Sequence, residues 1–362
     1  MNIPQQLSIE IASDCYPLLA IEQDYLESVY ADWKPARPTK VFATYWYFAA
    51  ERQKMFFGRL RQEAAPWTTD PILARHRFTN AYRASDRVSQ YLIKRVAYSG
   101  EHSDEDIFFR TLIFKIFNRI ETWELLKSET DEIRLSSYSF EKYDRVLTSE
   151  LENKRNIFSG AYIMPSGTSS FGHPRKHRNY LRLLELMIAE EVPGQMRDAR
   201  NLRNAFEILR GYPLLGDFLA YQYTIDLNYS PLMDHPESEF VVPGPGARDG
   251  IRKCFDSIGG LTEAEIIRLM AERQAFEFAR LGLSFSSLWG RPLQLIDCQN
   301  IFCEVDKYAR IAHPDVKGLS GRTRIKQLYR SKTNLLCYWY PPKWGLNNSI
   351  NHAIRQHTPE EE

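Results

Sequence analysis

Residues 106–126 are the part of the sequence that most limits the possible folds. They read DIFFRTLIFKIFNRIETWELL, and apolar side chains occupy almost every side of a helix built from them. Such a helix needs apolar neighbours all round, because an exposed side would leave large apolar groups in water. Ser103, with Asp106 three residues later, is typical of a capped helix N-terminus. We therefore predict one long core helix enclosed by other helices.

Helical patterns recur along the rest of the chain. Residues 135–180 are poorer in helix signals, and repeated Gly and Pro in SGAYIMPSGTSSFGHP predict a loop over residues 159–174. Alternating, strand-like runs are few, and we find no internal repeat. The sequence therefore predicts a mainly α protein built as a helical bundle. Apolar residues at helical spacing predict helices over about 41–63, 72–98, 180–188, 197–209, 262–281 and 294–311.

Three regions are expected from these patterns. Residues 1–38 form an N-terminal extension, with a surface strand or helix before the Pro35–Pro38 turn. Residues 39–311 form the helical domain, either as one body or as two lobes divided near residues 135–180. Residues 312–362 form a basic, aromatic C-terminal tail.

Composition excludes several classes of function. The 47 Lys and Arg residues balance 46 Asp and Glu, so bulk charge cannot hold a polyanion and any nucleic-acid surface must be local. No apolar run reaches the ~18 residues of a membrane span, and the first residues lack the pattern of a signal peptide. The five cysteines lack the spacing of zinc or iron–sulfur ligands. We expect reduced thiols, no metal or other cofactor, and a cytoplasmic location, or a nuclear one in a eukaryote.

A tight turn is expected at Gly216, between two helical patterns. Pro213, Gly216 and Ala220 resemble the hairpin of helix–hairpin–helix DNA glycosylases, in which backbone amides hold a DNA phosphate. Leu214 replaces the first glycine of that hairpin. An ordinary turn between helices explains the same residues, and both interpretations stay open. In those glycosylases a Val-Asp pair after the hairpin carries the catalytic Asp. In the comparable stretch here, residues 241–249, Pro or Gly occupies the Asp position and Asp249 lies further on, so we expect base excision to be lost.

The predicted helix over 294–311 carries a polar face. Asp297, Asn300, Glu304 and Lys307 lie on one side of it, opposite an apolar stripe. Two carboxylates beside an amide and an ammonium can serve as a general base and an anion holder. The alternative is a solvated face joined by ion pairs between residues three or four apart.

An arginine-rich segment precedes the core helix. Asn80, Arg83, Asp86, Arg87 and Gln90 lie close together on the helix predicted over this segment. The planar arginine side chain suits a bidentate partner such as phosphate. An Asp held between arginines is also common in purely structural networks, so this motif alone does not decide its role.

The region from Lys307 to Lys343 is locally basic. Nine cations face one acid, and Tyr and Trp residues alternate with them. Cations beside flat aromatic rings are typical of a nucleic-acid surface. A solvated C-terminal extension is the alternative.

Five segments in order along the chain also carry a family resemblance. The chain resembles the helical domains associated with 5-hydroxymethyl-deoxyuridine DNA kinases, which are related to α-glutamyl/putrescinyl thymine pyrophosphorylases. This resemblance implies action on 5-hydroxymethyluracil, or its pyrophosphorylated form, in DNA of phages and of some bacteria and fungi. It also implies a fold derived from the helix–hairpin–helix DNA glycosylases. The segments are YWYFAAERQKMFFGR, PWTTDPIL, RFTNAYRASDRVSQYLI, IFSGAYIMPSG and GRPLQLIDCQNIFCEVDKYAR.

We interpret the chain as a DNA-modifying enzyme. It would flip a modified thymine out of duplex DNA, and a nucleophile such as an amine would displace a phosphorylated leaving group from the 5-methylene carbon. No GxxxxGK[ST] motif occurs, so we expect P-loop kinase activity to belong to a separate partner. By residue type we assign the catalytic base to Asp297 or Glu304, phosphate binding to Arg83, Arg87, Lys307 and Arg310, base recognition to Asn80 and Asn300, and DNA contact to Gly216, Arg322, Arg324, Lys326 and Arg330.

Two other functions stay open. The chain could instead bind modified DNA without chemistry of its own and present it to a DNA kinase or another modification enzyme. It could also be a glycosylase with Asp249 as its catalytic acid. DNA is the expected partner in all three cases, and no membrane is expected.

Overall fold

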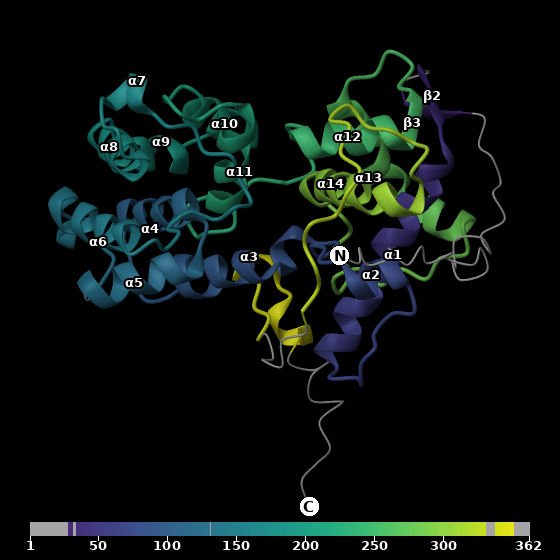
Figure 1. Ribbon diagram of the computed structural model, residues 1–362, viewed down its shortest axis with the longest axis horizontal. Coiled ribbons are helices and arrows are strands. Elements are labelled where there is room, and N and C mark those ends of the chain that lie inside the picture. Colours follow the sequence, from purple (N-terminus) through teal and green to yellow (C-terminus); the bar gives the residue numbers. More distant parts are fainter. Residues whose placement is uncertain (1–27, 32–33, 131, 331–336, 351–362) are drawn as a thin grey trace, which may run out of the picture. The chain divides into compact units, whose positions relative to one another are not determined.

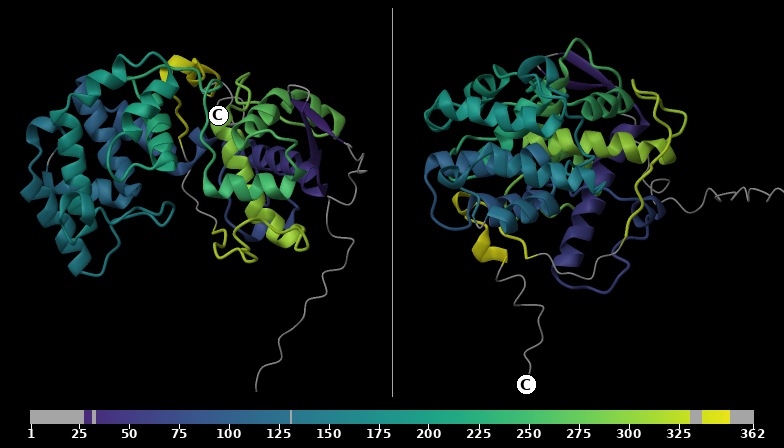
Figure 2. Two further views of the ribbon diagram at one scale, coloured as in Figure 1. Left: turned by 90° about the horizontal axis from the view of Figure 1, so that it is seen from above. Right: turned by 60° about the vertical axis from the view of Figure 1, so that its left-hand side comes forward.

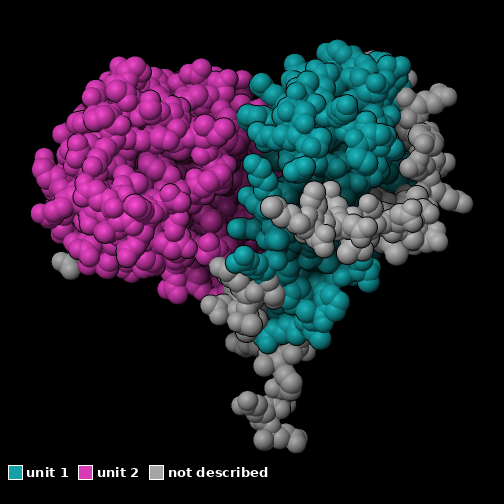
Figure 3. Space-filling model, viewed as in Figure 1, with its two compact units in different colours: residues 1–79, 245–286, 301–333 teal, residues 80–244, 287–300, 334–362 magenta. Residues whose placement is uncertain are grey.

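The computed structural model divides the chain into two compact units, each assembled from several chain segments (Figure 3). The region near residues 135–180, where we expected a division into two lobes, lies wholly within unit 2. Unit 1 comprises residues 1–79, 245–286 and 301–333, and unit 2 comprises residues 80–244, 287–300 and 334–362. The structure describes residues 28–31, 34–130, 132–330 and 337–350, and the statements below concern these.

Unit 1 combines helices with a small antiparallel sheet. Strand β2 pairs with β1 on one side and with β3 on the other. The elements of unit 1 are β1 (Val29–Ala31), β2 (Lys34–Pro38), α1 (Lys40–Leu60), α2 (Pro71–Arg75), α12 (Pro245–Cys254), β3 (Phe255–Ser257), α13 (Glu263–Arg280) and the part of α14 (Leu295–Ala312) from Ile301 onward.

Helix α1 forms much of the core of unit 1. The Thr39 side chain accepts a hydrogen bond from the Val41 amide and caps its N-terminus. The Trp46 ring packs edge-on to Phe278 of α13, with ring centroids 5.1 Å apart. Helices α12 and α14 approach so closely that a Cβ on Gly250 would lie 2.0 Å from the Phe302 carbonyl oxygen.

Unit 2 is almost entirely helical (Figures 1 and 2). The first residues of α14, up to Asn300, belong to it. Its other elements are the 3₁₀ turn η3 (Arg83–Ser85), α3 (Arg87–Tyr91), the π-helical turn η4 (Leu92–Ala97), α4 (Asp104–Phe117), α5 (Ile120–Thr130), the 3₁₀ turn η5 (Leu135–Ser137), α6 (Phe140–Glu152), α7 (Thr168–Phe171), α8 (Lys176–Ala189), α9 (Val192–Arg197), α10 (Leu202–Arg210), α11 (Asp217–Asn228) and the 3₁₀ turn η6 (Pro342–Trp344).

Helix α4 is the core helix of unit 2, as the sequence predicts. Every residue from Ile107 to Phe117 is buried, and α5, α8, α9 and α11 contact the helix. The Ser103 side chain accepts a hydrogen bond from the Asp106 amide. The prediction of one continuous helix over 106–126 is wrong, because Asn118 adopts a left-handed conformation with φ of 48° and ends α4. Asparagine tolerates this conformation better than most residues.

The mainly α fold class is confirmed, and two further local predictions are wrong. The helix predicted over 72–98 is broken into α2, η3, α3 and η4. The turn predicted at Pro35–Pro38 is part of strand β2 instead. The loop predicted over residues 159–174 holds only the short helix α7, and α6, whose N-terminus is capped by the Ser139 side chain, lies before it. In the part of the chain that the structure describes, no helix is both long and apolar enough to cross a membrane.

Candidate functional site

Unit 2 buries a carboxylate between two cations. Asp226 of α11 is 2% exposed, and its Oδ1 atom lies 2.7 Å from Arg83 Nη1. Its Oδ2 atom lies 2.6 Å from Nζ of Lys115 on α4. Burial alone would raise the pKa of Asp226, but the two cations together hold it below the usual range of a carboxyl group. The site therefore contains a carboxylate, not a neutral acid.

Polar contacts extend from this carboxylate to the surface. Lys115 Nζ donates a hydrogen bond of 3.0 Å to the Tyr162 hydroxyl. That hydroxyl donates to Gln222 Oε1 at 3.4 Å. Tyr162 is half-buried, and Ile163 beside it is 92% exposed, so the contacts approach solvent at Tyr162. We call Arg83, Lys115, Tyr162, Gln222 and Asp226 the Asp226 cluster.

A second buried ion pair lies in unit 2. Arg291 Nη2 is 2.9 Å from Glu237 Oε1, and burial raises the pKa of Glu237 to about 7. Lys343 Nζ donates to the carbonyl oxygens of Asn228, Ser230 and Met233, just after α11. Burial lowers the pKa of Lys343 to about 8.

Asp297 binds the backbone on both sides of its carboxylate. Oδ1 accepts a hydrogen bond of 2.8 Å from the Arg83 amide, and Oδ2 accepts one of 3.0 Å from the Gln294 amide. Burial raises the pKa of Asp297 to about 6. The carboxylate thus ties the segment of Arg83 to the start of α14. The structure brings Arg83 and Asp297 together through the Arg83 backbone amide, while the Arg83 guanidinium pairs with Asp226.

Glu304 and Lys307 belong to unit 1. Lys307 Nζ lies 2.8 Å from Glu304 Oε2, which also accepts a hydrogen bond from the Thr79 amide at 3.1 Å. The side chain of Lys307 is 15% exposed and that of Glu304 is 13% exposed, so the ion pair is half-buried instead of solvated. Asn300, one turn earlier on α14, belongs to unit 2 and is half-buried.

The segment before α3 forms a closed turn. Asn80 Nδ2 donates to the Ser85 carbonyl at 2.7 Å, and the Asn80 amide donates to Asp86 Oδ1 at 2.8 Å. The side-chain amide that we assigned to base recognition therefore takes part in this turn. Arg87 is half-buried at the first residue of α3.

The predicted helical hairpin is present. Helices α10 and α11 contact each other and are joined by residues 211–216. Gly216 is exposed and is the N-cap residue of α11, with φ of −69°, which any residue can adopt. Leu214 takes the left-handed conformation instead, with φ of 69°. A φ above zero costs a leucine conformational energy, and an ordinary turn between helices fits this geometry as well as a glycosylase-type hairpin.

The predicted DNA-contacting cations of the tail are exposed on unit 1. Their segment is extended, and its backbone is fixed by hydrogen bonds from Arg77 N to Gln327 O and from Tyr329 N to Arg75 O. The predicted aromatic surface is wrong for Tyr338 and Tyr340, which are buried in unit 2. The exposed cations are Arg322, Arg324, Lys326 and Arg330.

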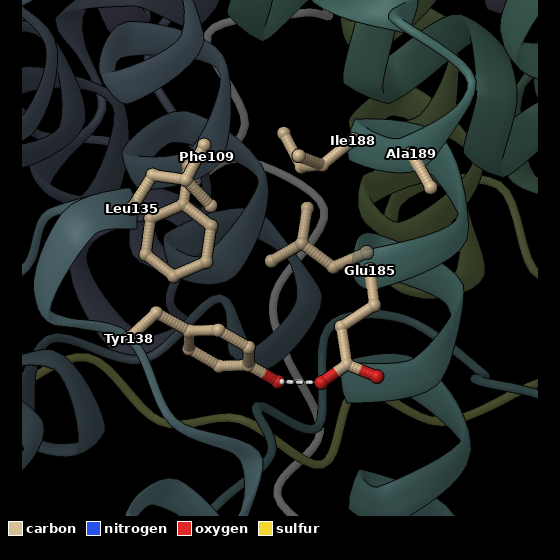
Figure 4. Close-up of a pocket in the computed structure, with 7 residues that line it drawn as sticks. Phe109, Leu135, Tyr138, Glu185, Ile188 and Ala189 are labelled. Carbon is tan, nitrogen blue, oxygen red and sulfur yellow. Dashed lines mark hydrogen bonds between the residues drawn. The ribbon is translucent and has the colours of Figure 1, made fainter.

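Unit 2 also contains an apolar cavity of about 190 Å³ between Phe109, Leu135, Tyr138 and α8. Its polar groups satisfy each other, because the Tyr138 hydroxyl donates to Glu185 Oε1 at 3.0 Å (Figure 4). This volume is below the roughly 300 Å³ of small ligand sites. We therefore do not treat it as the functional site.

Lys115 and Asp226 were missed by the sequence analysis. Both carry a detectable signal, because each is a single charge inside an otherwise uncharged stretch, LIFKIF and YTIDLNY. A buried charge is costly unless it is paired, so such a residue predicts a partner elsewhere in the chain. Spacing along the sequence does not identify that partner.

Comparison with known proteins gives two matches. A family model described as "5-hmdU DNA kinase, helical domain" matches residues 39–318. A curated 5-hmdU DNA kinase of Bacillus phage SP10 is 26% identical over 285 residues, which cover 73% of this chain and 44% of that protein. The chain thus corresponds to less than half the length of this relative. No solved structure matches the chain.

Proposed function

Because this chain belongs to the 5-hmdU DNA kinase helical-domain family, we propose that it takes part in the modification of 5-hydroxymethyluracil in DNA. The match over residues 39–318 supports this assignment. These 362 residues carry no GxxxxGK[ST] motif, so we assign phosphorylation of the base to a P-loop domain outside them.

The reaction that we propose for this chain is a substitution on a flipped, pyrophosphorylated 5-hydroxymethyluracil. An amine nitrogen forms a bond to the 5-methylene carbon, and the bond from that carbon to the pyrophosphate oxygen breaks. Pyrophosphate leaves as an anion, and the amine loses a proton to a protein base. Such a step needs cations beside the departing oxygens and a carboxylate near the nucleophile.

The Asp226 cluster is the observation that carries this proposal. In it two buried cations flank one carboxylate, so the cluster by itself carries a net positive charge. A buried excess of this sign favours an anionic ligand, since isolated charges are costly in an apolar interior. Lys115 and Arg83 would bind the departing phosphate, and Asp226 would accept the proton. Displacement of the Tyr162 side chain would give the substrate access.

Asp226 replaces Asp297 as the proposed base, because Asp226 is the carboxylate that lies between the two cations proposed to bind the leaving group. The two oxygens of Asp297 accept hydrogen bonds from the Arg83 and Gln294 amides, so its proposed role is to position Arg83. Glu304 and Lys307 lie in unit 1 as an ion pair, and we propose that they support the backbone at Thr79. The exposed tail cations and the amides after Gly216 are proposed contacts for DNA phosphates.

Substitution of Lys115 tests this function. Lys115→Met keeps the length of the side chain and removes its charge, whereas Lys127→Met makes the same change at an exposed position of α5. DNA containing pyrophosphorylated 5-hydroxymethyluracil is incubated with each protein and an amine, and the nucleosides are quantified by mass spectrometry. We expect Lys115→Met to lower product formation about 100-fold and Lys127→Met to leave it unchanged. Wild-type activity in a folded Lys115→Met protein would remove the Asp226 cluster from the mechanism.

A non-catalytic role is the second candidate. Each oxygen of Asp226 already has a cation as partner, so the cluster is satisfied without a ligand, as a structural ion network would be. The chain would then bind modified DNA and present it to another enzyme. In this case purified protein binds the modified DNA but forms no new nucleoside.

A further inference from the structure

Unit 1 contains a small pocket with a strongly basic lining. Its volume is about 120 Å³, and it lies between the ends of α12 and α14 and the loop 313–323. No aromatic ring lines it. The residues that form it are Lys253, Arg310, Pro314, Val316, Lys317, Gly318, Gly321, Arg322 and Thr323, and we call it the Arg310 pocket.

Asp249 shapes the loop that closes this pocket. Its Oδ1 atom accepts a hydrogen bond of 2.8 Å from the Ser320 amide. A Cβ on Gly318 would lie 3.0 Å from the same oxygen, so glycine allows the loop to pack against the carboxylate. Gly321 has φ of 62°, a conformation that favours glycine and turns the chain back toward the pocket. The loop is thus held in place without any ligand.

One donor of Arg310, a residue that lines this pocket, has no acceptor. The Arg310 side chain is 10% exposed, and its Nε atom is buried without a hydrogen-bond partner among the residues that the structure describes. Its other nitrogens are engaged, Nη2 with Asp306 and Nη1 with the Arg324 carbonyl at 3.1 Å. A buried guanidinium N–H without an acceptor is unfavourable, which an oxygen ligand in the pocket would relieve.

The charges around the pocket also favour an anion. Asp306 pairs with Arg310 and, at 2.9 Å, with Lys253. Lys317 and Arg322 are exposed and form no ion pair within the described ranges of the chain. Asp315 of the same loop pairs with Lys40 at 2.8 Å, and Asp249 accepts the Ser320 amide, so neither carboxylate neutralises Lys317 or Arg322 within the described residues.

We propose that the Arg310 pocket binds a single phosphate group. Its volume is below the roughly 300 Å³ of sites for larger ligands, which excludes a nucleotide. Arginine binds phosphate oxygens through parallel N–H donors, and lysine adds charge. A phosphodiester of DNA and free phosphate share this chemistry. Assigning the phosphate to DNA depends on the proposed function, but binding of phosphate itself does not.

Inorganic phosphate is the first probe. The melting temperature of the full chain is measured against phosphate concentration at constant ionic strength, with chloride as reference. We expect phosphate to stabilise the wild type and Lys317→Ala/Arg322→Ala to weaken its apparent affinity at least tenfold. The matched control is Arg37→Ala/Lys54→Ala, which removes two cations from unit 1 whose side chains are 61% and 68% exposed. Arg310→Lys keeps the charge but removes Nε, and we expect it to weaken binding as well.

A short DNA oligonucleotide identifies the source of the phosphate. If Lys317→Ala/Arg322→Ala lowers oligonucleotide affinity together with phosphate affinity, the pocket holds a backbone phosphate of DNA. If only phosphate affinity falls, the pocket holds free phosphate. Equal effects of phosphate on the wild type, the pocket variants and the control, or none on any of them, would overturn the proposal. Failure of the Lys115→Met test leaves this result unaffected, since no turnover is measured here.

Discussion

The ammonium nitrogen of Lys115 lies 2.6 Å from a carboxylate oxygen of Asp226, and their side chains are only 3% and 2% exposed. The two residues come from α4 and α11, which contact each other within unit 2. Burial makes this ion pair sensitive to loss of either partner, because water cannot solvate the charge that is left behind.

The first prediction concerns Asp226→Asn. The amide has nearly the same shape but leaves Arg83 and Lys115 buried without a compensating charge. We expect the free energy of unfolding, measured with urea, to fall by about 3–5 kcal/mol. Asp217→Asn is the control on the same helix, because Asp217 is 61% exposed and pairs with Arg210. Its effect is expected to stay below about 1 kcal/mol, and equal losses in both variants would contradict the importance of the buried pair.

The second prediction is a pH dependence of stability from Glu237. Burial raises its pKa from 4.5 to about 7 in the folded chain, so the folded state binds the proton more tightly than the unfolded state. Stability therefore decreases as the pH rises from 4.5 to about 7. The loss is about 3 kcal/mol at about 1.4 kcal/mol for each pKa unit. Asp297 acts in the same direction, with its pKa raised from 3.8 to about 6 by burial.

Glu237→Gln tests this pH dependence. The amide is neutral at all these pH values and still accepts a hydrogen bond from Arg291, so the decrease in stability between pH 4.5 and 7 becomes smaller. Glu207→Gln, at an exposed position of α10, serves as the control. Urea unfolding at a series of pH values measures both. An unchanged slope in Glu237→Gln would show that Glu237 does not titrate in this window.

The third prediction compares two glycines. Gly250→Ala would place a methyl group 2.0 Å from the Phe302 carbonyl oxygen and push α12 away from α14. We expect a loss of at least about 2 kcal/mol in unfolding free energy, although alanine normally favours a helix. Gly216→Ala meets no atom within 4 Å and is expected to cost less than about 1 kcal/mol. Thermal unfolding of the two variants measures the difference, and similar stabilities would contradict the close packing of these helices.

The fourth prediction concerns the exposed tail cations. Lys326→Ala/Arg330→Ala removes two cations from an extended segment whose backbone is fixed in unit 1. If they contact DNA phosphates, the double variant should lower the slope of log affinity against log salt concentration by about 0.7–0.9 for each contact. Fluorescence anisotropy with a labelled oligonucleotide at several salt concentrations gives the slope. Lys54→Ala is the control, and a wild-type slope in the double variant would exclude these two residues from the DNA surface.

Several elements follow from short-range sequence patterns. The N-cap Thr262 and Glu265 form the capping box of α13, and Ser103 caps α4, because capping needs only residues three positions apart. The break of the core helix at Asn118 was not predicted. The apolar pattern of the predicted helix continues past Asn118. The left-handed conformation of Asn118 that ends α4 depends on packing.

The mainly helical class and the burial of α4 could be predicted from the sequence, since helical periodicity and residue type are short-range properties. The pairing of Asp226 with Arg83 and Lys115 depends on tertiary packing, because the three residues come from three separate elements of unit 2. The same holds for the bonds from Asp297 to backbone amides and for the place of Glu304 in unit 1. A buried charge requires a partner, but its identity depends on which helices pack together, and that is a property of the whole core.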